Sequence, residues 1–236
     1  PHLIMKYNIS PDKIIGVKSS GISVTKLLKQ QTPLSHLKTE GACITPNGAM
    51  FKNDNPGFLP RLLEKMYNDR VKFKTLEFQS KQEYQKTKNK ELTKKIATYH
   101  NIQWAKKISL NSAYGAIGNQ YFRYYDVRQA TAITTSGQFV IRFIENKVNE
   151  YMNNILKTHD KVDYIVASDT DSIYLTLDKL VEVTCKDKPV EHILRFINKV
   201  VDSRIQPFLD KCFAELADYT NAIGNKMVMK LSLIHI

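Results

Sequence analysis

The chain has 236 residues, 42% hydrophobic and 25% charged, and its 35 Lys and Arg against 23 Asp and Glu give a net charge of +12. This composition is typical of a folded globular chain; no apolar run reaches the roughly 20 residues of a membrane span, and we expect no signal peptide. The three cysteines form no CxxC pair, which argues against a disulfide framework or a zinc site and fits a reducing cytosol, whereas the positive charge favours a polyanionic partner, nucleic acid before membrane.

The first half of the chain predicts a β-hairpin followed by two long helices. Residues 41–52 place the turn Pro46-Asn47-Gly48 between two short apolar stretches, which is typical of a β-hairpin. Apolar residues at three- and four-residue steps predict one helix over about 61–86 and another over about 90–113, joined by a polar tip at 87–89. We therefore expect a long antiparallel helical hairpin that projects from the body of the protein.

The second half of the chain predicts a helix, an acidic turn between two strands, and a final helical stretch. Apolar residues recur at helical spacing over about 131–157. Residues 163–177 form two β-type runs around an acidic turn. The final helical stretch covers about 189–220, and we expect it to kink or restart near Pro207.

The positive charge is concentrated in the predicted helical hairpin. Residues 61–107 contain 13 Lys or Arg and 5 Asp or Glu, so they carry eight of the twelve net charges. A narrow basic hairpin of this kind can bind nucleic-acid phosphates. A solvated hairpin without a ligand explains the charge pattern equally well.

The acidic turn consists of Asp169-Thr170-Asp171-Ser172. If the chain stays extended there, the two carboxylates point to one face. Neighbouring like charges are tolerated where a divalent cation neutralises them, and oxygen ligands suit Mg²⁺. A polar hairpin turn without a metal is the alternative, because Asp, Thr and Ser all favour turns.

Two polar stripes are predicted near the base of the helical hairpin. Arg70 and Lys74 are four residues apart on the first helix and share one of its faces. One face of the second helix carries a Lys, an Asn and a Tyr at i, i+4 and i+7, with a Gly after the Tyr: Lys107, Asn111, Tyr114 and Gly115. A guanidinium and two ammoniums that converge suit a triphosphate, and a flat ring beside bare backbone suits a base pair. For any single residue, a polar side chain that faces water is the simpler interpretation.

These motifs together resemble those of family B DNA polymerases. The segment Lys107-Ile-Ser-Leu-Asn-Ser-Ala-Tyr-Gly115 resembles their Lys-x3-Asn-Ser-x-Tyr-Gly fingers motif, and the acidic turn at 169–172 resembles their second catalytic palm motif. Arg70 precedes Lys107 by 37 residues, as their nucleotide-binding Arg does. The stretch 118–138 is similar to the replicative polymerases of T-even-type phages, and the resemblance runs from Pro1 to about Lys230.

The resemblance implies an α+β fold, in which a palm of antiparallel β-sheet and packing helices is interrupted by a two-helix fingers hairpin. Residues 1–60 would be the first part of the palm, 61–106 the fingers hairpin, and 107–230 the fingers base and second part of the palm. The implied activity is the addition of deoxynucleotides to a primer 3′-end by two-metal phosphoryl transfer during DNA replication. Residues 231–236 do not resemble the family and are interpreted as a non-family tail or a sequencing scar.

The resemblance also implies a role for each matched residue. Asp171 would be a catalytic metal ligand with Asp169 as a supporting carboxylate, and two Mg²⁺ ions would be the cofactor. The side chains that hold the incoming nucleotide would be Arg70, Lys74, Lys107 and Asn111. The residues beside the nascent base pair and the DNA would be Tyr114, Gly115, Thr170 and Ser172.

The chain departs from the family pattern at both ends. In the family, a catalytic Asp and a sugar-gating Tyr stand immediately before the Pro that matches Pro1, and this chain contains neither. No exonuclease domain and no thumb are matched either. We therefore expect a palm-and-fingers fragment that lacks one metal ligand and supports no synthesis alone. Ser168, where relatives often carry Gly, is a minor change.

The implied partners are primer-template DNA, deoxynucleoside triphosphates and, through missing C-terminal regions, a sliding clamp, with no membrane partner. A phage protein of this kind would act in the cytoplasm of the bacterial host. A non-catalytic nucleic-acid-binding module is the alternative, and it would bind duplex DNA regardless of a matching nucleotide. A relative with decayed catalysis is disfavoured, because both carboxylates of the acidic turn are intact.

Overall fold

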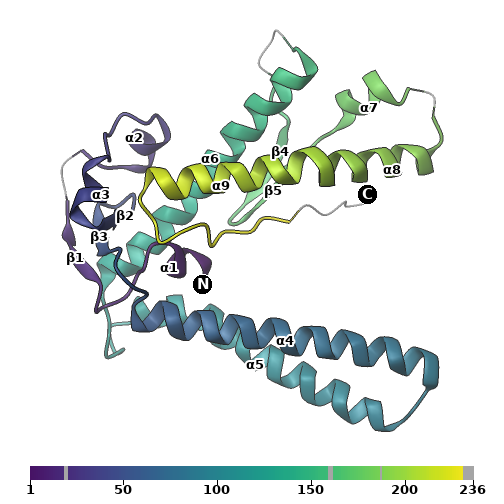
Figure 1. The fold of residues 1–236 in the computed structure, drawn as a ribbon, viewed down its shortest axis with the longest axis horizontal. Helices are drawn as coiled ribbons and strands as arrows, with labels where there is room; N and C mark the ends of the chain where they lie inside the picture. Colours follow the sequence, from purple (N-terminus) through teal and green to yellow (C-terminus); the bar gives the residue numbers. More distant parts are fainter. Residues whose placement is uncertain (19–20, 159–161, 187, 231–236) are drawn as a thin grey trace.

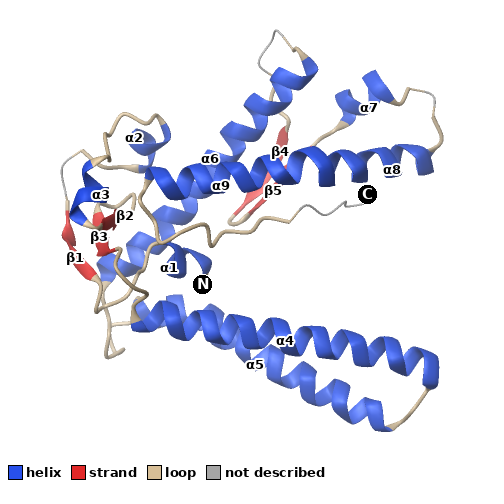
Figure 2. Ribbon diagram, viewed as in Figure 1, coloured by secondary structure: helices blue, strands red, loops and turns tan. Residues whose placement is uncertain are grey.

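The computed structural model describes residues 1–18, 21–158, 162–186 and 188–230. Long helices dominate the fold, accompanied by two small antiparallel sheets (Figures 1 and 2). The expected α+β class is confirmed. Residues 231–236, interpreted as a non-family tail or a scar, lie outside the described residues. Among the described helices, none combines the length and apolar composition that a membrane span requires.

The N-terminal part folds around a three-stranded antiparallel sheet with the strand order β1-β3-β2. The hairpin expected over 41–52 is present as β2 (Ala42–Ile44) and β3 (Ala49–Lys52). Gly48 in its turn adopts a positive φ of +83°, and a Cβ there would overlap the carbonyl oxygen of Lys18. Both features require glycine at this position. Four elements of this part were not predicted, because elements of four or five residues leave little periodicity: α1 (His2–Lys6), β1 (Ile14–Val17), α2 (Val24–Leu28) and α3 (His36–Glu40).

The predicted helical hairpin is present as α4 (Phe58–Thr87) and α5 (Glu91–Ile117), each a few residues longer than expected. The two helices pack against each other and extend as an arm from the body (Figure 1). Leu63 and Leu110 join the core at the base of the arm. Farther out, the interface also buries the polar residues Glu77, Ser80 and Gln103. The arm is therefore held partly by polar contacts between its two helices.

The long helix α6 (Val127–Leu156) connects the two apolar clusters of the core. It begins where the Asp126 side chain accepts a hydrogen bond from the backbone N–H of Arg128 at 2.9 Å, a typical N-cap. Ala132 packs in the cluster around α1, β3 and the base of the hairpin. Phe139 and Phe143 pack in the larger cluster, which includes α9. The helix expected over 131–157 is thereby confirmed, with an earlier start.

The C-terminal half contains the second sheet and a chain of helices. The strands β4 (Ile165–Asp169) and β5 (Ser172–Leu175) pair in an antiparallel hairpin, followed by the unpredicted short helix α7 (Asp178–Thr184). The final helical stretch consists of α8 (Val190–Val200), a π-helical turn (Val201–Ile205) and α9 (Gln206–Tyr219). Pro207 lies in the first turn of α9, so the restart expected near it is confirmed.

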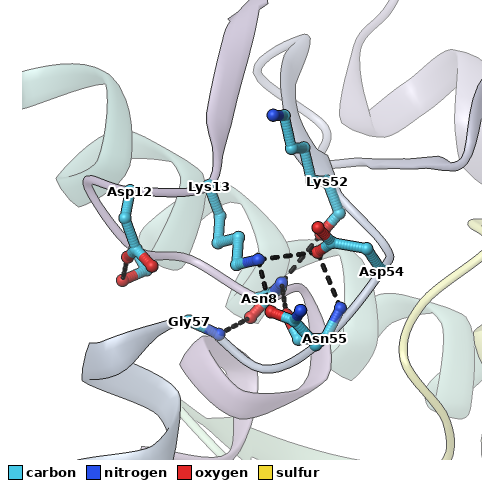
Figure 3. A network of polar contacts seen from close by, with 8 residues as sticks. Asn8, Asp12, Lys13, Lys52, Asp54, Asn55 and Gly57 are labelled. Carbon is cyan, nitrogen blue, oxygen red and sulfur yellow. Dashed lines mark hydrogen bonds and ion pairs between the residues drawn. The ribbon is translucent and has the colours of Figure 1, made fainter.

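A polar network fastens the N-terminal segment to the start of α4 (Figure 3). Asn8 Nδ2 donates to the carbonyl oxygen of Asn55 at 3.0 Å, and Asn8 Oδ1 accepts from the Gly57 backbone N–H at 2.8 Å. The ammonium of the buried Lys13 donates to Asp54 Oδ1 at 2.7 Å and to Asn55 Oδ1 at 2.6 Å. The network therefore attaches the start of α4 to the N-terminal segment.

Candidate functional site

The acidic turn joins β4 to β5 through Thr170 and Asp171. Asp169 pairs with Ser172 in the strand register, so two residues form the tip. Thr170 adopts the left-handed region at φ +45°, and its Oγ1 donates to Asp169 Oδ1 at 2.8 Å. Ser172 Oγ donates to the carbonyl oxygen of Asp169 at 3.2 Å. The chain turns between the two aspartates instead of staying extended, so the alternation of strand faces does not govern how they point.

Both carboxylates of this turn are exposed and can offer the oxygen ligands that Mg²⁺ prefers. Within the described ranges, no three His, Cys, Asp or Glu side chains gather into a group that could hold a metal. The donor chemistry of Asp169 and Asp171 therefore fits a Mg²⁺ ion whose remaining ligands are substrate or water oxygens. A site for two ions needs a further carboxylate beside this pair.

The two polar stripes of the hairpin lie level with each other near its base. Lys106 Nζ on α5 lies 2.8 Å from Asp69 Oδ2 on α4, and the hydrogen bond from Lys106 holds the pKa of Asp69 below its usual range. Arg70 and Lys107 directly follow these two residues in the chain, so the ion pair sets them at one level of the hairpin. Lys74 lies one helical turn farther towards the tip.

The three cations of the stripes have no carboxylate partner among the described residues. Arg70 Nε is buried and lacks a hydrogen-bond partner within the described protein, while Lys74 is exposed. Lys107 Nζ lies 4.5 Å from the centre of the Trp104 ring. No carboxylate of the described chain therefore forms a salt bridge with these three positive charges. Sequence reasoning missed Trp104, although its position three residues before Lys107 was the available signal.

The base of α5 presents an exposed ring beside open space. Tyr114 is 44% exposed, and Asn111 is exposed as well. A Cβ added to Gly115 would meet no protein atom within 4 Å. A flat ligand can therefore approach the backbone at Gly115 without displacing protein atoms.

A cavity of about 610 Å³ joins the base of α5 to the acidic turn. Tyr114, Thr170 and Asp171 all line it, so the structure brings these three predicted site residues together. The lining residues include none of the predicted cations of the hairpin and neither Asn111 nor Asp169. Other lining side chains that sequence reasoning had assigned no role come from α1, α6, α9 and the C-terminal segment: His2, Gln138, Arg142, Phe213, Met227 and Met229.

The family model of DNA polymerase family B matches residues 1–216. The DNA-directed DNA polymerase of Escherichia phage RB69 is 29% identical over an alignment of 272 residues, which covers 97% of this chain and 30% of that relative. The DNA-directed DNA polymerase of Enterobacteria phage T4 is 45% identical over 130 residues, or 54% of this chain and 14% of that relative. A DNA polymerase of Pyrococcus glycovorans is 27% identical over 198 residues, or 84% of this chain and 20% of that relative.

The chain spans less than a third of the length of each of these relatives. The resemblance inferred from the fingers motif and the acidic turn is confirmed by the family match and by the two phage relatives. Since the match extends over residues 1–216, the chain belongs to DNA polymerase family B.

Proposed function

We propose that this chain supplies the nucleotide-binding site and part of the catalytic site of a DNA-directed DNA polymerase. The reaction adds a deoxynucleotide to a primer: the primer 3′-hydroxyl attacks the α-phosphorus of the incoming triphosphate, a new phosphodiester bond forms, and pyrophosphate leaves. The substrates are primer-template DNA and the four deoxynucleoside triphosphates. A sliding clamp is a further partner, bound through regions outside this chain.

The observation that supports this proposal most strongly is the cavity shared by Tyr114 and Asp171. These residues belong to the two motifs that are most specific to the family, and they come from distant parts of the chain. A polymerase needs the nascent base pair and the reacting phosphate to be neighbours. Tyr114 with Gly115 would pack against the base pair, and Thr170 and Ser172 would lie near the DNA.

The cations of the hairpin would bind the triphosphate. Arg70 can offer a planar fork of donors, while Lys74 and Lys107 can offer point charges. Asn111 lies one turn beyond Lys107 on the same face of α5 and would contact the nucleotide between the phosphates and Tyr114. Because these cations have no carboxylate partner within the described chain, a triphosphate does not have to displace one.

Asp171 and Asp169 would hold Mg²⁺ in this site. When bound, two such ions supply charge stabilisation to the attacking and leaving oxygens. Thr170 Oγ1 restrains the Asp169 carboxylate by donating to its Oδ1, and Ser172 Oγ restrains the turn by donating to the backbone carbonyl oxygen of Asp169. In this proposal residues 1–60 and much of 107–230 form the palm, and residues 61–106 form the fingers hairpin.

Primer extension by the complete polymerase that contains this chain tests the role of Asp171. The Asp171→Ala variant should lower the rate by at least about a hundredfold, the scale of losing one group that stabilises transition-state charge. Asp178→Ala is a matched control, because Asp178 is also exposed and lies at the start of α7. A native rate in Asp171→Ala would contradict the proposal.

Nucleotide dependence separates this proposal from a non-catalytic DNA-binding module. A polymerase site holds primer-template more tightly when Mg²⁺ and the matching nucleotide are present, and Arg70→Ala or Lys107→Ala should abolish that preference. A binding module holds duplex DNA equally well with matched, mismatched or no nucleotide. Equal binding under all three conditions would therefore favour the binding module.

A further inference from the structure

The polar stripe on α5 continues beyond Lys107 towards the tip of the hairpin. His100, Trp104, Lys107, Asn111 and Tyr114 follow one another at steps of four and three residues, so they share one face of the helix. The last three are the proposed nucleotide contacts. The proposed function gives His100 and Trp104 no role, although Trp104 is a large apolar side chain that remains 48% exposed.

The exposed indole of Trp104 lies against the proposed phosphate-binding cation. Lys107 Nζ is 4.5 Å from the centre of the ring, within the range in which an ammonium is attracted to the negative face of an aromatic ring. A lysine side chain has four rotatable bonds and many rotamers of similar energy in water. Contact with the larger ring of Trp104 therefore restricts where the ammonium of Lys107 lies.

The indole of Trp104 also lies near a second ring, that of His100. The His100 ring stacks near that of Trp104, with centroids 6.1 Å apart and planes at 16°. His100 Nδ1 lies 3.1 Å from Glu77 Oε1 on the neighbouring helix α4. Glu77 is only 6% exposed and also accepts a hydrogen bond from Lys81 Nζ at 2.6 Å. Through His100, Trp104 is thus connected to a buried carboxylate, Glu77, on the opposite arm of the hairpin.

We propose that Trp104 is a positioning residue for Lys107, which it holds on the nucleotide-binding face of α5, ready for the incoming triphosphate. The inference rests on the proposed function, since it gives Trp104 a role only if Lys107 binds that triphosphate. Trp104 acts through Lys107 and does not itself bind the nucleotide. His100 lies beside Trp104 and contacts Glu77, so these two residues connect Trp104 to α4.

The competing explanation is that Trp104 only stabilises the hairpin. In that case its loss affects nucleotide binding through general loosening of the arm, with or without Lys107. A double-mutant cycle separates the two explanations, because a positioning effect disappears when Lys107 is absent and a structural effect does not.

The experiment measures the KM for the incoming nucleotide and kcat in single-nucleotide primer extension, with the complete polymerase. Trp104→Leu should raise KM about two- to fivefold, the range of an exposed cation–π contact, with kcat little changed. Trp104→Phe keeps an aromatic face and should restore much of the native KM. In the Lys107→Ala background, Trp104→Leu should have no further effect on KM.

Tyr99→Leu is the matched control. Tyr99 is the neighbour of His100 on α5, and the centroid of its ring lies 6.0 Å from that of the Phe73 ring on α4. The substitution therefore removes an aromatic contact between the arms. Any effect of Tyr99→Leu on KM should be the same with and without Lys107.

The outcomes separate the inference from the proposed function. If Lys107→Ala raises KM but Trp104→Leu does not, the positioning role is wrong and the proposed function stands. Equal effects of Trp104→Leu in both backgrounds also overturn the positioning role. If Lys107→Ala leaves KM unchanged, both the positioning role and the proposed triphosphate site are wrong.

Discussion

Lys106 on α5 and Asp69 on α4 form an ion pair with an Nζ–Oδ2 distance of 2.8 Å, immediately beside Lys107 and Arg70. The pair joins the two arms of the hairpin at the level of the proposed triphosphate site. The alignment of Arg70 on α4 with Lys107 on α5 therefore depends on the ion pair between their neighbours, Asp69 and Lys106.

Breaking this ion pair should weaken nucleotide binding less than removal of a binding cation does. Asp69→Asn is expected to raise the KM for the incoming nucleotide, by less than Lys107→Ala does, because it only loosens the alignment of the arms. The lowered pKa of Asp69 adds a pH dependence. The ion pair contributes to the stability of the folded hairpin above the unfolded-state pKa of Asp69. This contribution is lost as the pH falls through the folded-state pKa of Asp69. The charge swap Asp69→Lys with Lys106→Asp should recover part of the native KM, and no recovery would contradict an alignment role.

Gly57 should not tolerate a side chain. A Cβ there would lie 2.6 Å from Ser10 Cβ and 2.9 Å from Lys13 Cγ, in the network that fastens α4 to the body. Gly57→Ala is therefore expected to lower the free energy of unfolding by about 1–3 kcal/mol, the usual cost of overpacking. Chemical denaturation checks the value. Gly16→Ala is the control, because a Cβ at Gly16 meets nothing within 4 Å.

Gly115→Ala should separate stability from activity. Gly115 lies inside α5 and a Cβ there meets no protein atom within 4 Å, so alanine should stabilise the helix by about 0.5–1 kcal/mol through its higher helix propensity. If the nascent base pair packs against this backbone, the added methyl group should nevertheless slow primer extension. A variant that is more stable and equally active would contradict the role proposed for Gly115.

Lys6 should make stability depend on alkaline pH. Its side chain is fully buried, its Nζ has no hydrogen-bond partner among the described residues, and burial lowers the pKa of Lys6 from 10.5 to about 8. Below pH 8 the buried ammonium destabilises the fold by up to about 3 kcal/mol, since each pKa unit corresponds to about 1.4 kcal/mol. This cost disappears as the pH rises from 8 to 10.5, because the unfolded chain then binds the proton that the folded chain has released.

Lys6→Met isolates this effect from other groups that titrate at high pH. The stability advantage of the variant over the native chain should be largest below pH 8 and should shrink between pH 8 and 10.5. Denaturation curves at a series of pH values measure the difference. An advantage that does not change with pH would show that Lys6 has the same pKa in the folded and the unfolded chain.

Sequence periodicity predicted the long elements well. The helices α4, α5 and α6 each bury one stripe of residues, so the spacing of their apolar side chains reports the element directly. The acidic turn between β4 and β5 was also predicted, because turn-forming residues separate two β-type runs. The direction of its carboxylates was not, since Thr170 enters the left-handed region.

By itself, then, the amino-acid sequence determined the long helices, the turn and the family, because each depends on residues close together in the chain or on a motif. Only the tertiary structure decided which distant residues meet. The pairing of β1 with β3, the burial of Glu77 between the arms and the contact of Tyr114 and Asp171 with one cavity depend on long-range packing. Local patterns carry no record of such packing, because its free energy comes from surfaces that touch only after the chain has folded.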